Sequence, residues 1–281
     1  MEKLILSPSR VKKWVRCKRS YYWRYNQKLV RIRKEVPMSL GSVVGEALAR
    51  YYNEDQMSRT QEVLDYHTNK TLKDLSPKAE AITKDPTLKG DWEKITRISR
   101  TLLSTYHEWA LPKDTFEVVS VETTYQVELT PSIYLIAIPD TVVKDQHEGL
   151  PLILEHKVRY RYRPGDFNLD YQSVGSCLAS GAIGTIYNVL EYSKTKYHRT
   201  PHIRDRYELD YFRDIFIHIG EDILRTPPED LYPMPMGRCH CEYFELCNAE
   251  QTGLDIEDIV NELYTLSKGK PEEEKPEEPE E

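Results

Sequence analysis

The sequence has no long apolar segment. Nowhere in its 281 residues do about 18 apolar residues follow one another, which is the length that a membrane-spanning helix requires. The opening residues, MEKLILSPSRVKKW, also lack the apolar stretch of roughly 7–15 residues that marks a secretory signal. We therefore expect no membrane partner and a cytoplasmic location, which would be the host cytoplasm if a phage encodes the chain.

Strong charge of one sign is absent from most of the chain. The net charge is −7, but the segment from Lys268 to Glu281 contributes −4 of it. Residues 1–34 hold twelve Lys or Arg and a single Glu, and a second basic group consists of Lys157, Arg159, Arg161 and Arg163. Basic segments on a nearly neutral chain suit a polyanion such as DNA. The alternative is that these charges lie on solvated helix faces.

Paired cysteines are not expected either. The chain has five Cys, an odd number, and the absence of a secretory signal argues further against a disulfide framework. Cys239, Cys241 and Cys247 crowd into the segment RCHCEYFELC, whereas Cys17 lies far upstream. Cysteines this close together indicate a metal or cluster site, and ordinary buried thiols are the alternative. Cys177 is expected to be a small core residue.

Apolar residues recur at helical spacing in the first part of the chain. They predict helices near residues 8–25, 38–53 and 92–109, with a polar, Lys-rich stretch reaching to about residue 88. β-rich runs follow at 116–129, 133–143 and 151–158, and the turn-forming residues between them predict a three-strand meander. The remaining expected elements are a helix over 167–180, a strand over 185–192, and helices over 209–225 and near 255–267.

This order of elements predicts a single domain of the α/β (α+β) class with an N-terminal helical portion. We expect it to cover residues 1–267, divided into a mainly helical part (1–110), a core with the sheet (115–200) and a helix with the Cys cluster (205–250). Residues 268–281, KGKPEEEKPEEPEE, have no apolar side chain to bury, which predicts a disordered acidic tail.

Two carboxylates and an ammonium group follow apolar strands of the predicted meander. Asp140 ends the run IAIPD, and fifteen positions later the run LILEHK presents Glu155 and Lys157. Strand side chains alternate, so Glu155 and Lys157 share a face, and a hairpin would bring Asp140 beside Glu155. Adjacent carboxylates repel each other unless a cation neutralises them, and Mg²⁺ is held by one or two such groups. The alternative is that these charged residues only end two strands and face water.

These motifs resemble the D…(D/E)xK signature of the PD-(D/E)xK nucleases, and more narrowly their RecB-like branch. That branch includes the iron-sulfur exonucleases of CRISPR systems and of the AddB subunit, and many phage recombination nucleases are similar. Its order is an N-terminal helix with one Cys, a G-x-x-x-H helix, the nuclease core, a Q-x-x-x-Y helix and three Cys. The chain follows this order from about residue 5 to residue 248. The resemblance implies a restriction-endonuclease-like central mixed sheet flanked by helices.

The resemblance also implies a role for each matching residue. Asp140, Glu155 and the backbone carbonyl of His156 would hold Mg²⁺ or Mn²⁺, and the His156 ring would point to the other side of the strand. Lys157 would orient or help to deprotonate the attacking water. Gln172 would lie near the active site, and Glu122 stands where this group often has an acid. Arg159, Arg161 and Arg163 would then hold the scissile strand.

Two positions depart from the branch. Gly45 stands where the G-x-x-x-H motif has its His, and Ser176 stands where the Q-x-x-x-Y motif has its Tyr. The neighbouring Glu46 could compensate for the missing His. We expect an active Mg²⁺- or Mn²⁺-dependent deoxyribonuclease, an exonuclease in DNA recombination, repair or phage DNA processing, with a possible recombination or replication protein as partner. The alternative is a catalytically impaired module that binds DNA or protein.

For the cysteines the resemblance implies a 4Fe-4S cluster held by Cys17, Cys239, Cys241 and Cys247. Such a site would tie the two ends of the chain together. The first gap is C-x-C here, whereas the branch usually has C-x-x-C. A tetrahedral Zn²⁺ site stays open as the alternative, and His240 could replace one thiolate. A cluster-bearing redox sensor is a third reading, supported by the Cys alone.

Overall fold

The computed structural model describes residues 3–32, 40–82, 86–146, 148–167, 169–233, 239 and 241–267. The predicted acidic tail and His240 lie outside these residues. The chain divides into two compact units. Unit 1 consists of Met1–Arg33, Gln126–Ala137 and Tyr207–Glu281, and unit 2 of Lys34–Tyr125 and Ile138–Arg206.

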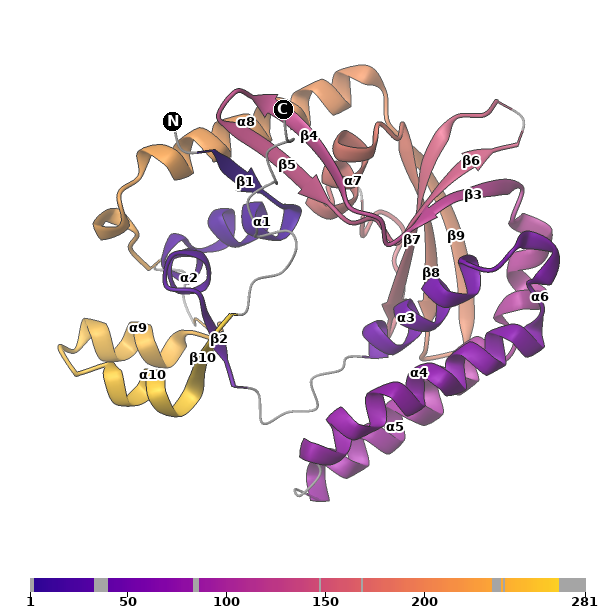
Figure 1. Cartoon of the computed structure of the whole chain (residues 1–281), viewed down its shortest axis with the longest axis horizontal. Coiled ribbons are helices and arrows are strands. Elements are labelled where there is room, and N and C mark those ends of the chain that lie inside the picture. The colour runs from indigo at the N-terminus through magenta and orange to yellow at the C-terminus, as the bar shows by residue number, and fades with distance from the viewer. Residues whose placement is uncertain are drawn as a thin grey trace, which may run out of the picture. The chain divides into compact units, whose positions relative to one another are not determined.

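Unit 2 is built on a five-stranded mixed sheet with the order β3-β6-β7-β8-β9 (Figure 1). Its strands are β3 (Phe116–Val121), β6 (Thr141–Asp145), β7 (Pro151–Arg159), β8 (Gly184–Glu191) and β9 (Lys196–Ile203). β7 and β8 run parallel, and the other neighbours are antiparallel. The connection from β7 to β8 contains helix α7 (Tyr171–Ser180), which a parallel crossover requires.

Helices cover both faces of this sheet. Alternate residues of β7, Leu152 and Leu154, pack in a core with α3 (Leu40–Tyr52), α4 (Gln61–Ile82), α5 (Pro86–Leu103) and α6 (Tyr106–Ala110). The other face of β7 meets α7, whose Gln172 contacts Glu155. Because both faces are covered, β7 and β8 are largely apolar instead of alternating.

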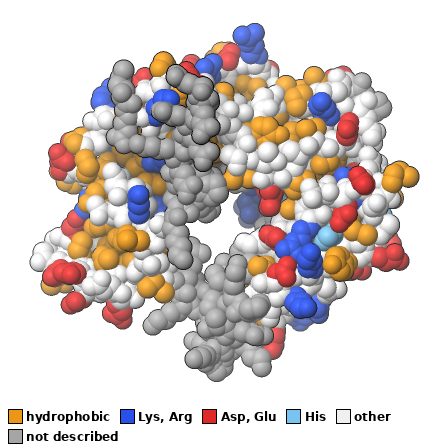
Figure 2. Space-filling model, viewed as in Figure 1, with side chains coloured by type: hydrophobic (Ala, Val, Ile, Leu, Met, Phe, Trp, Pro, Cys, Tyr) orange, Lys and Arg blue, Asp and Glu red, His pale blue; other side chains and the backbone are white. Residues whose placement is uncertain are grey.

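The polar stretch before residue 88 forms much of a helical hairpin, in which α4 and α5 lie side by side (Figure 1). The polar residues of this stretch fit the side of the hairpin that faces solvent. Charged side chains of both signs gather over α3 and α4 in Figure 2. Arg50 binds Glu46 and Asp74 at 2.9 Å each, and His67 lies 2.8 Å from Glu54. Ion pairs that reach the surface in this way contribute little stability each, so the apolar face of the hairpin holds it to the sheet.

Unit 1 combines a three-stranded sheet, a two-stranded ribbon and helices. The sheet has the order β1-β5-β4, and the ribbon pairs β10 with β2. Its strands are β1 (Leu4–Leu6), β2 (Leu29–Arg31), β4 (Tyr125–Thr130), β5 (Ile133–Ala137) and β10 (Tyr264–Leu266). Its helices are α1 (Pro8–Arg16), α2 (Lys18–Tyr21), a π-helical turn (Tyr22–Asn26), α8 (Arg206–Arg225), α9 (Phe244–Gln251) and α10 (Glu257–Leu263).

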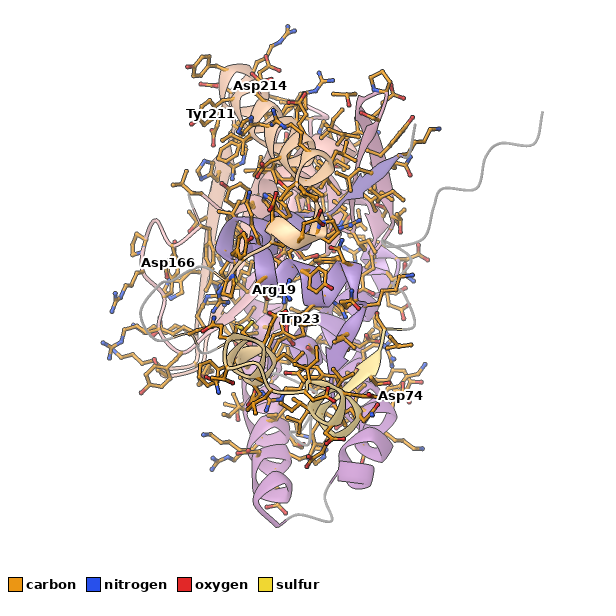
Figure 3. All side chains as sticks on the ribbon, turned by 90° about the vertical axis from the view of Figure 1, so that its left-hand side faces the viewer. Arg19, Trp23, Asp74, Asp166, Tyr211 and Asp214 are labelled. Carbon is orange, nitrogen blue, oxygen red and sulfur yellow. The ribbon has the colours of Figure 1, made fainter. Side chains whose placement is uncertain are left out.

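Ion pairs join the basic N-terminal segment to the C-terminal part of unit 1. Lys13 binds Glu242 at 2.7 Å, and Lys18 binds Asp222 at 2.7 Å. Arg19 pairs with Glu250, and its guanidinium lies over the ring of Trp23; both Arg19 and Trp23 are labelled in Figure 3. These charges are therefore engaged within the fold. The aromatic residues Trp14, Tyr21 and Trp23 are buried and form part of the core.

The structure confirms the α/β class but corrects the predicted meander. The runs 116–129 and 133–143 are each two strands, because Glu122 takes a positive φ of 46° after β3 and Pro139 separates β5 from β6. β4 and β5 then join a different sheet from β3 and β6. Asp140 accordingly precedes β6, where the sequence suggested that it ends a strand. β9 was not predicted, since its polar residues show no clear apolar alternation.

In the described part of the chain, no helix is both long and apolar enough to cross a membrane.

Gly184 provides a test of the packing between β8 and β9. A Cβ at Gly184 would lie 2.6 Å from the His202 carbonyl oxygen and 2.9 Å from Cα of Ile203. We expect Gly184→Ala to lower the free energy of unfolding by about 1–3 kcal/mol, because backbone must move to admit the methyl group. Gly90→Ala is the matched control, since a Cβ there meets nothing within 4 Å and helix α5 gains up to about 1 kcal/mol. Urea denaturation measures both, and equal effects would contradict this packing.

Candidate active site

The register of β6 against β7 brings Asp140 beside Glu155. Thr141 pairs with Leu154 in this antiparallel ladder, so the residue before Thr141 lies across from the residue after Leu154. The backbone N–H of His156 donates to Asp140 Oδ2 at 2.8 Å, and this bond fixes the carboxylate against β7. The backbone N–H of Glu122 donates to the Asp140 carbonyl at 3.1 Å and ties the end of β3 to the same point.

Lys157 and Gln172 complete a tight cluster around Glu155. Lys157 Nζ lies 2.6 Å from Glu155 Oε1 and 3.3 Å from Gln172 Oε1. The Gln172 amide donates to the same Glu155 oxygen at 2.9 Å. The structure therefore brings together four side chains that the sequence singled out: Asp140, Glu155, Lys157 and Gln172.

Asp170 is a member of this cluster that the sequence analysis missed. It caps the N-terminus of α7 by accepting from the Gln172 N–H, and its Oδ2 lies 3.8 Å from Lys157 Nζ. An Asp immediately before an expected helix is a common N-cap, so the pattern was visible. Its contact with Lys157 was not, because it depends on how α7 packs on β7.

The protein environment of the cluster disfavours the ionised forms of the Asp140 and Glu155 carboxyl groups. Glu155 is 1% exposed, and its burial, followed by the charge of Asp140, raises its pKa to about 7. Burial also raises the pKa of Asp140, although the His156 N–H and Lys157 oppose this. For Lys157, burial favours the neutral amine, but the charge and hydrogen bond of Glu155 outweigh it and raise the pKa. Lys157 thus stays protonated and compensates only part of the charge.

A divalent cation fits this site. Glu155 Oε2 is buried and has no hydrogen-bond partner among the described residues. A buried carboxylate oxygen without a partner is costly, and a bound cation would remove that cost. The described residues contain no group of three or more His, Cys, Asp or Glu side chains arranged to hold a metal ion. Mg²⁺ does not require one, because it keeps several waters and uses one or two carboxylates with substrate phosphates.

The His156 side chain lies away from this cluster. Its ring stacks on Tyr52 with centroids 5.4 Å apart, and both ring nitrogens are buried without hydrogen-bond partners in the described part of the chain. Burial, followed by the positive charges of Arg199 and Lys157, lowers the pKa of the ring to about 3, which keeps it neutral.

The cluster opens into a cleft of about 850 Å³. Glu122 and Arg159 line it, whereas Arg161 and Arg163 are exposed on the following loop and are not among its described lining residues. Burial and the nearby Glu46 raise the pKa of Glu122. Gly45 also lines the cleft, and a Cβ there would meet nothing within 4 Å, so the space for a side chain exists. A second cleft of about 770 Å³ near Tyr52 and β3 contains none of the predicted catalytic residues.

Four of the cysteines, Cys17, Cys239, Cys241 and Cys247, belong to unit 1, and within the described residues no three of them form a group arranged to hold a metal ion. Cys239 Sγ is 3.4 Å from Cys241 Sγ. Burial, followed by Cys239 and Cys247, raises the pKa of Cys241 to about 11. Burial also raises the pKa of Cys247, and Cys17 and Cys239 contribute to that rise. Each of these thiols therefore either changes the pKa of another or has its own pKa changed by one. Cys177 lies instead in unit 2, buried on α7 against Thr185.

In comparisons with known proteins, one family model matches most of the chain. The sequence model of a family described as the PD-(D/E)XK nuclease superfamily matches residues 5–248. No curated protein matches the chain. Among solved structures, the one titled "Crystal structure of SSO0001" is 11% identical, covers 66% of this chain and 86% of its own, and has a TM-score of 0.30. A likeness that weak carries no argument.

The raised pKa of Glu155 gives metal binding a pH dependence. A carboxyl group with a pKa of about 7 still carries its proton at pH 6, and a cation must displace that proton. We expect Mn²⁺ binding to release close to one proton at pH 6 and about a tenth of that at pH 8. Calorimetry in buffers of different ionisation enthalpy measures the release, and Glu155→Gln is the control. Equal release at both pH values would contradict this assignment.

Proposed function

The chain belongs to the PD-(D/E)XK nuclease superfamily, and from this premise we propose that it is a Mg²⁺- or Mn²⁺-dependent deoxyribonuclease acting at Asp140, Glu155 and Lys157. One observation carries the proposal: Asp140 lies beside the buried Glu155, whose Oε2 has no described hydrogen-bond partner and whose Oε1 lies 2.6 Å from Lys157 Nζ. Perturbed carboxyl pKa values in a cleft support the same site, because such groups concentrate where chemistry occurs.

Each residue has a part that its contacts support. Asp140 and Glu155, with the His156 carbonyl, would hold the cation, which supplies a polarised phosphate and a water of lowered pKa. Lys157 donates from Nζ toward the charge that develops on the phosphate, and the raised pKa keeps that donor protonated. Gln172 orients Glu155 and Lys157, since it bonds to both. Glu122 lines the same cleft and adds an acid at its rim.

The arginines after β7 are proposed to hold the DNA strand. Arg159 follows Glu155 and Lys157 at alternate strand positions and lines the cleft, so it lies on the catalytic face. Arg161 and Arg163 are exposed on the loop that continues from it. Guanidinium groups beside a metal site would bind phosphates on either side of the cut.

The proposed mode of cleavage and cellular process are supported by the order of motifs along the chain. We propose an exonuclease in DNA recombination, repair or phage DNA processing, with residues 1–267 acting as one nuclease domain and a recombination or replication protein as a possible partner. A catalytically impaired binding module is the alternative, and the empty space at Gly45 is the observation that favours it.

The nuclease proposal is tested with labelled linear DNA and Mn²⁺. We expect Lys157→Ala and Glu155→Gln each to lower the rate of degradation by about 100-fold or more, because each removes a charge that acts on the transition state. Lys70→Ala, exposed on α4, is the control and should degrade DNA like the wild type. Equal degradation by all the proteins would reject the site, and DNA binding without cleavage by the wild type would favour the binding module.

We also propose that Cys17, Cys239, Cys241 and Cys247 hold a 4Fe-4S cluster. Support comes from the mutual effects of the four thiols on the pKa values of Cys241 and Cys247. Four thiolates from both ends of the chain would bind the cluster and contribute its ligation energy to folding.

Protein purified without oxygen is expected to be brown and to contain about four iron atoms per chain. Cys17→Ser should lose most of that iron, whereas Cys177→Ser, which changes a thiol buried within unit 2 against Thr185, should keep it. Colourless protein with one zinc per chain would replace the cluster by a Zn²⁺ site. Protein without metal would contradict both assignments.

A further inference from the structure

A row of three polar side chains crosses the sheet of unit 2 behind the catalytic strand. His156 of β7 pairs in register with Asn188 of β8, and Asn188 pairs with Arg199 of β9. Residues in register point to the same face, so the three side chains lie together on the face opposite Glu155 and Lys157. That face is covered by α3 and α6, and it is a costly place for polar groups unless they are hydrogen-bonded.

Asn188 and Arg199 belong to a closed ring of hydrogen bonds, here called the polar ring. Arg199 donates from Nε to Asn188 Oδ1 at 2.8 Å, and from NH2 to Asp114 Oδ1 at 2.7 Å. Asn188 Nδ2 donates to Tyr106 Oη at 2.8 Å. The circuit closes through Tyr52, whose Oη lies 3.1 Å from Tyr106 Oη and donates to Asp114 Oδ2 at 3.0 Å.

The proton positions of the polar ring follow from its closure. Because the Tyr52 hydroxyl gives its proton to Asp114, it must accept the proton of Tyr106. Donation then runs from Arg199 through Asn188, Tyr106 and Tyr52 to Asp114, and Arg199 binds Asp114 directly as well. Tyr52, Tyr106 and Asn188 are fully buried, and a satisfied buried network of this kind fixes side chains in a single arrangement.

The polar ring shapes the slot that holds His156. The imidazole stacks on Tyr52 at 5.4 Å and meets the edge of Tyr106 at 6.4 Å. Neither ring nitrogen has a hydrogen-bond partner among the described residues, so stacking alone orients the side chain. The peptide N–H of the same residue donates to Asp140 Oδ2 at 2.8 Å, toward the neighbouring strand β6. A shift of the imidazole would therefore move the group that holds Asp140.

We propose that Tyr52 and Tyr106, locked by the polar ring, are positioning residues for the metal site, and that they act through the stacked His156 ring on the Asp140 carboxylate. This inference rests on the proposed function only in taking Asp140 and Glu155 as the cation ligands. The chain of contacts is continuous from Arg199 to Asp140, and one link in it is the stacking of His156 on Tyr52. Groups that orient metal ligands in this indirect way commonly change metal affinity by 10–100-fold, on the order of the effect expected here.

The first test compares two tyrosines that are neighbours on α3. Tyr52→Phe removes the hydroxyl that closes the polar ring. Tyr51→Phe removes a hydroxyl from a neighbouring buried tyrosine, bonded to His107 Nδ1 at 2.6 Å, which is not part of the ring. We expect Tyr52→Phe to weaken Mn²⁺ binding about tenfold and Tyr51→Phe to leave it within about twofold. Calorimetry without DNA measures the affinity, and denaturation checks that both variants are folded.

The second test replaces the imidazole itself. His156→Phe keeps the stack and removes the two unpartnered nitrogens, so Mn²⁺ affinity should stay close to that of the wild type. His156→Ala removes the stack and should weaken Mn²⁺ binding about as much as Tyr52→Phe. Equal losses in Tyr51→Phe and Tyr52→Phe, or a loss in His156→Phe as large as in His156→Ala, would overturn the inference. A wild type that binds Mn²⁺ but leaves DNA intact would refute the nuclease proposal alone.

Discussion

The repulsion between two adjacent carboxylates is the constraint on which the arrangement of unit 2 depends. Asp140 and the buried Glu155 lie side by side at a cleft that both line, and the Lys157 ammonium group compensates only part of their charge. This arrangement has a free-energy cost. With its pKa raised to about 7, Glu155 requires about 3 kcal/mol more to ionise here than in water. A bound cation would remove that cost, so the proposed affinity for metal would have the same origin as the raised pKa of Glu155.

The sheet of unit 2 holds Asp140 and Glu155 next to each other in spite of this repulsion. The β6–β7 register sets the two carboxylates across from each other, and the His156 peptide holds one of them in place. On the far face of β7, a buried stack and a closed hydrogen-bond circuit fix the strand from behind. With the proposed catalytic residues on one face of β7 and rigid packing on the other, the strand has what a preorganised site requires.

The sequence allowed part of this arrangement to be predicted. The alternation of a strand was enough to place Glu155 and Lys157 on one face, and helical spacing located α3, α7 and α8. The prediction that Asp140 ends a strand was wrong. A continuous apolar run does not reveal that β5 and β6 belong to different sheets, with Asp140 between them. Asp170 and the polar ring were missed for a related reason. Their contacts join residues up to 85 positions apart, as between Asp114 and Arg199, and no local pattern encodes such pairings.

The most direct measurement is anomalous scattering from crystals of the wild-type protein soaked with Mn²⁺. One strong manganese peak is expected in the unit 2 cleft, about 2.0–2.6 Å from an Asp140 oxygen and from Glu155 Oε2, the atom without a hydrogen-bond partner among the described residues. A peak elsewhere, or an empty cleft with Lys157 still bound to Glu155, would contradict the assignment of Asp140 and Glu155 as cation ligands.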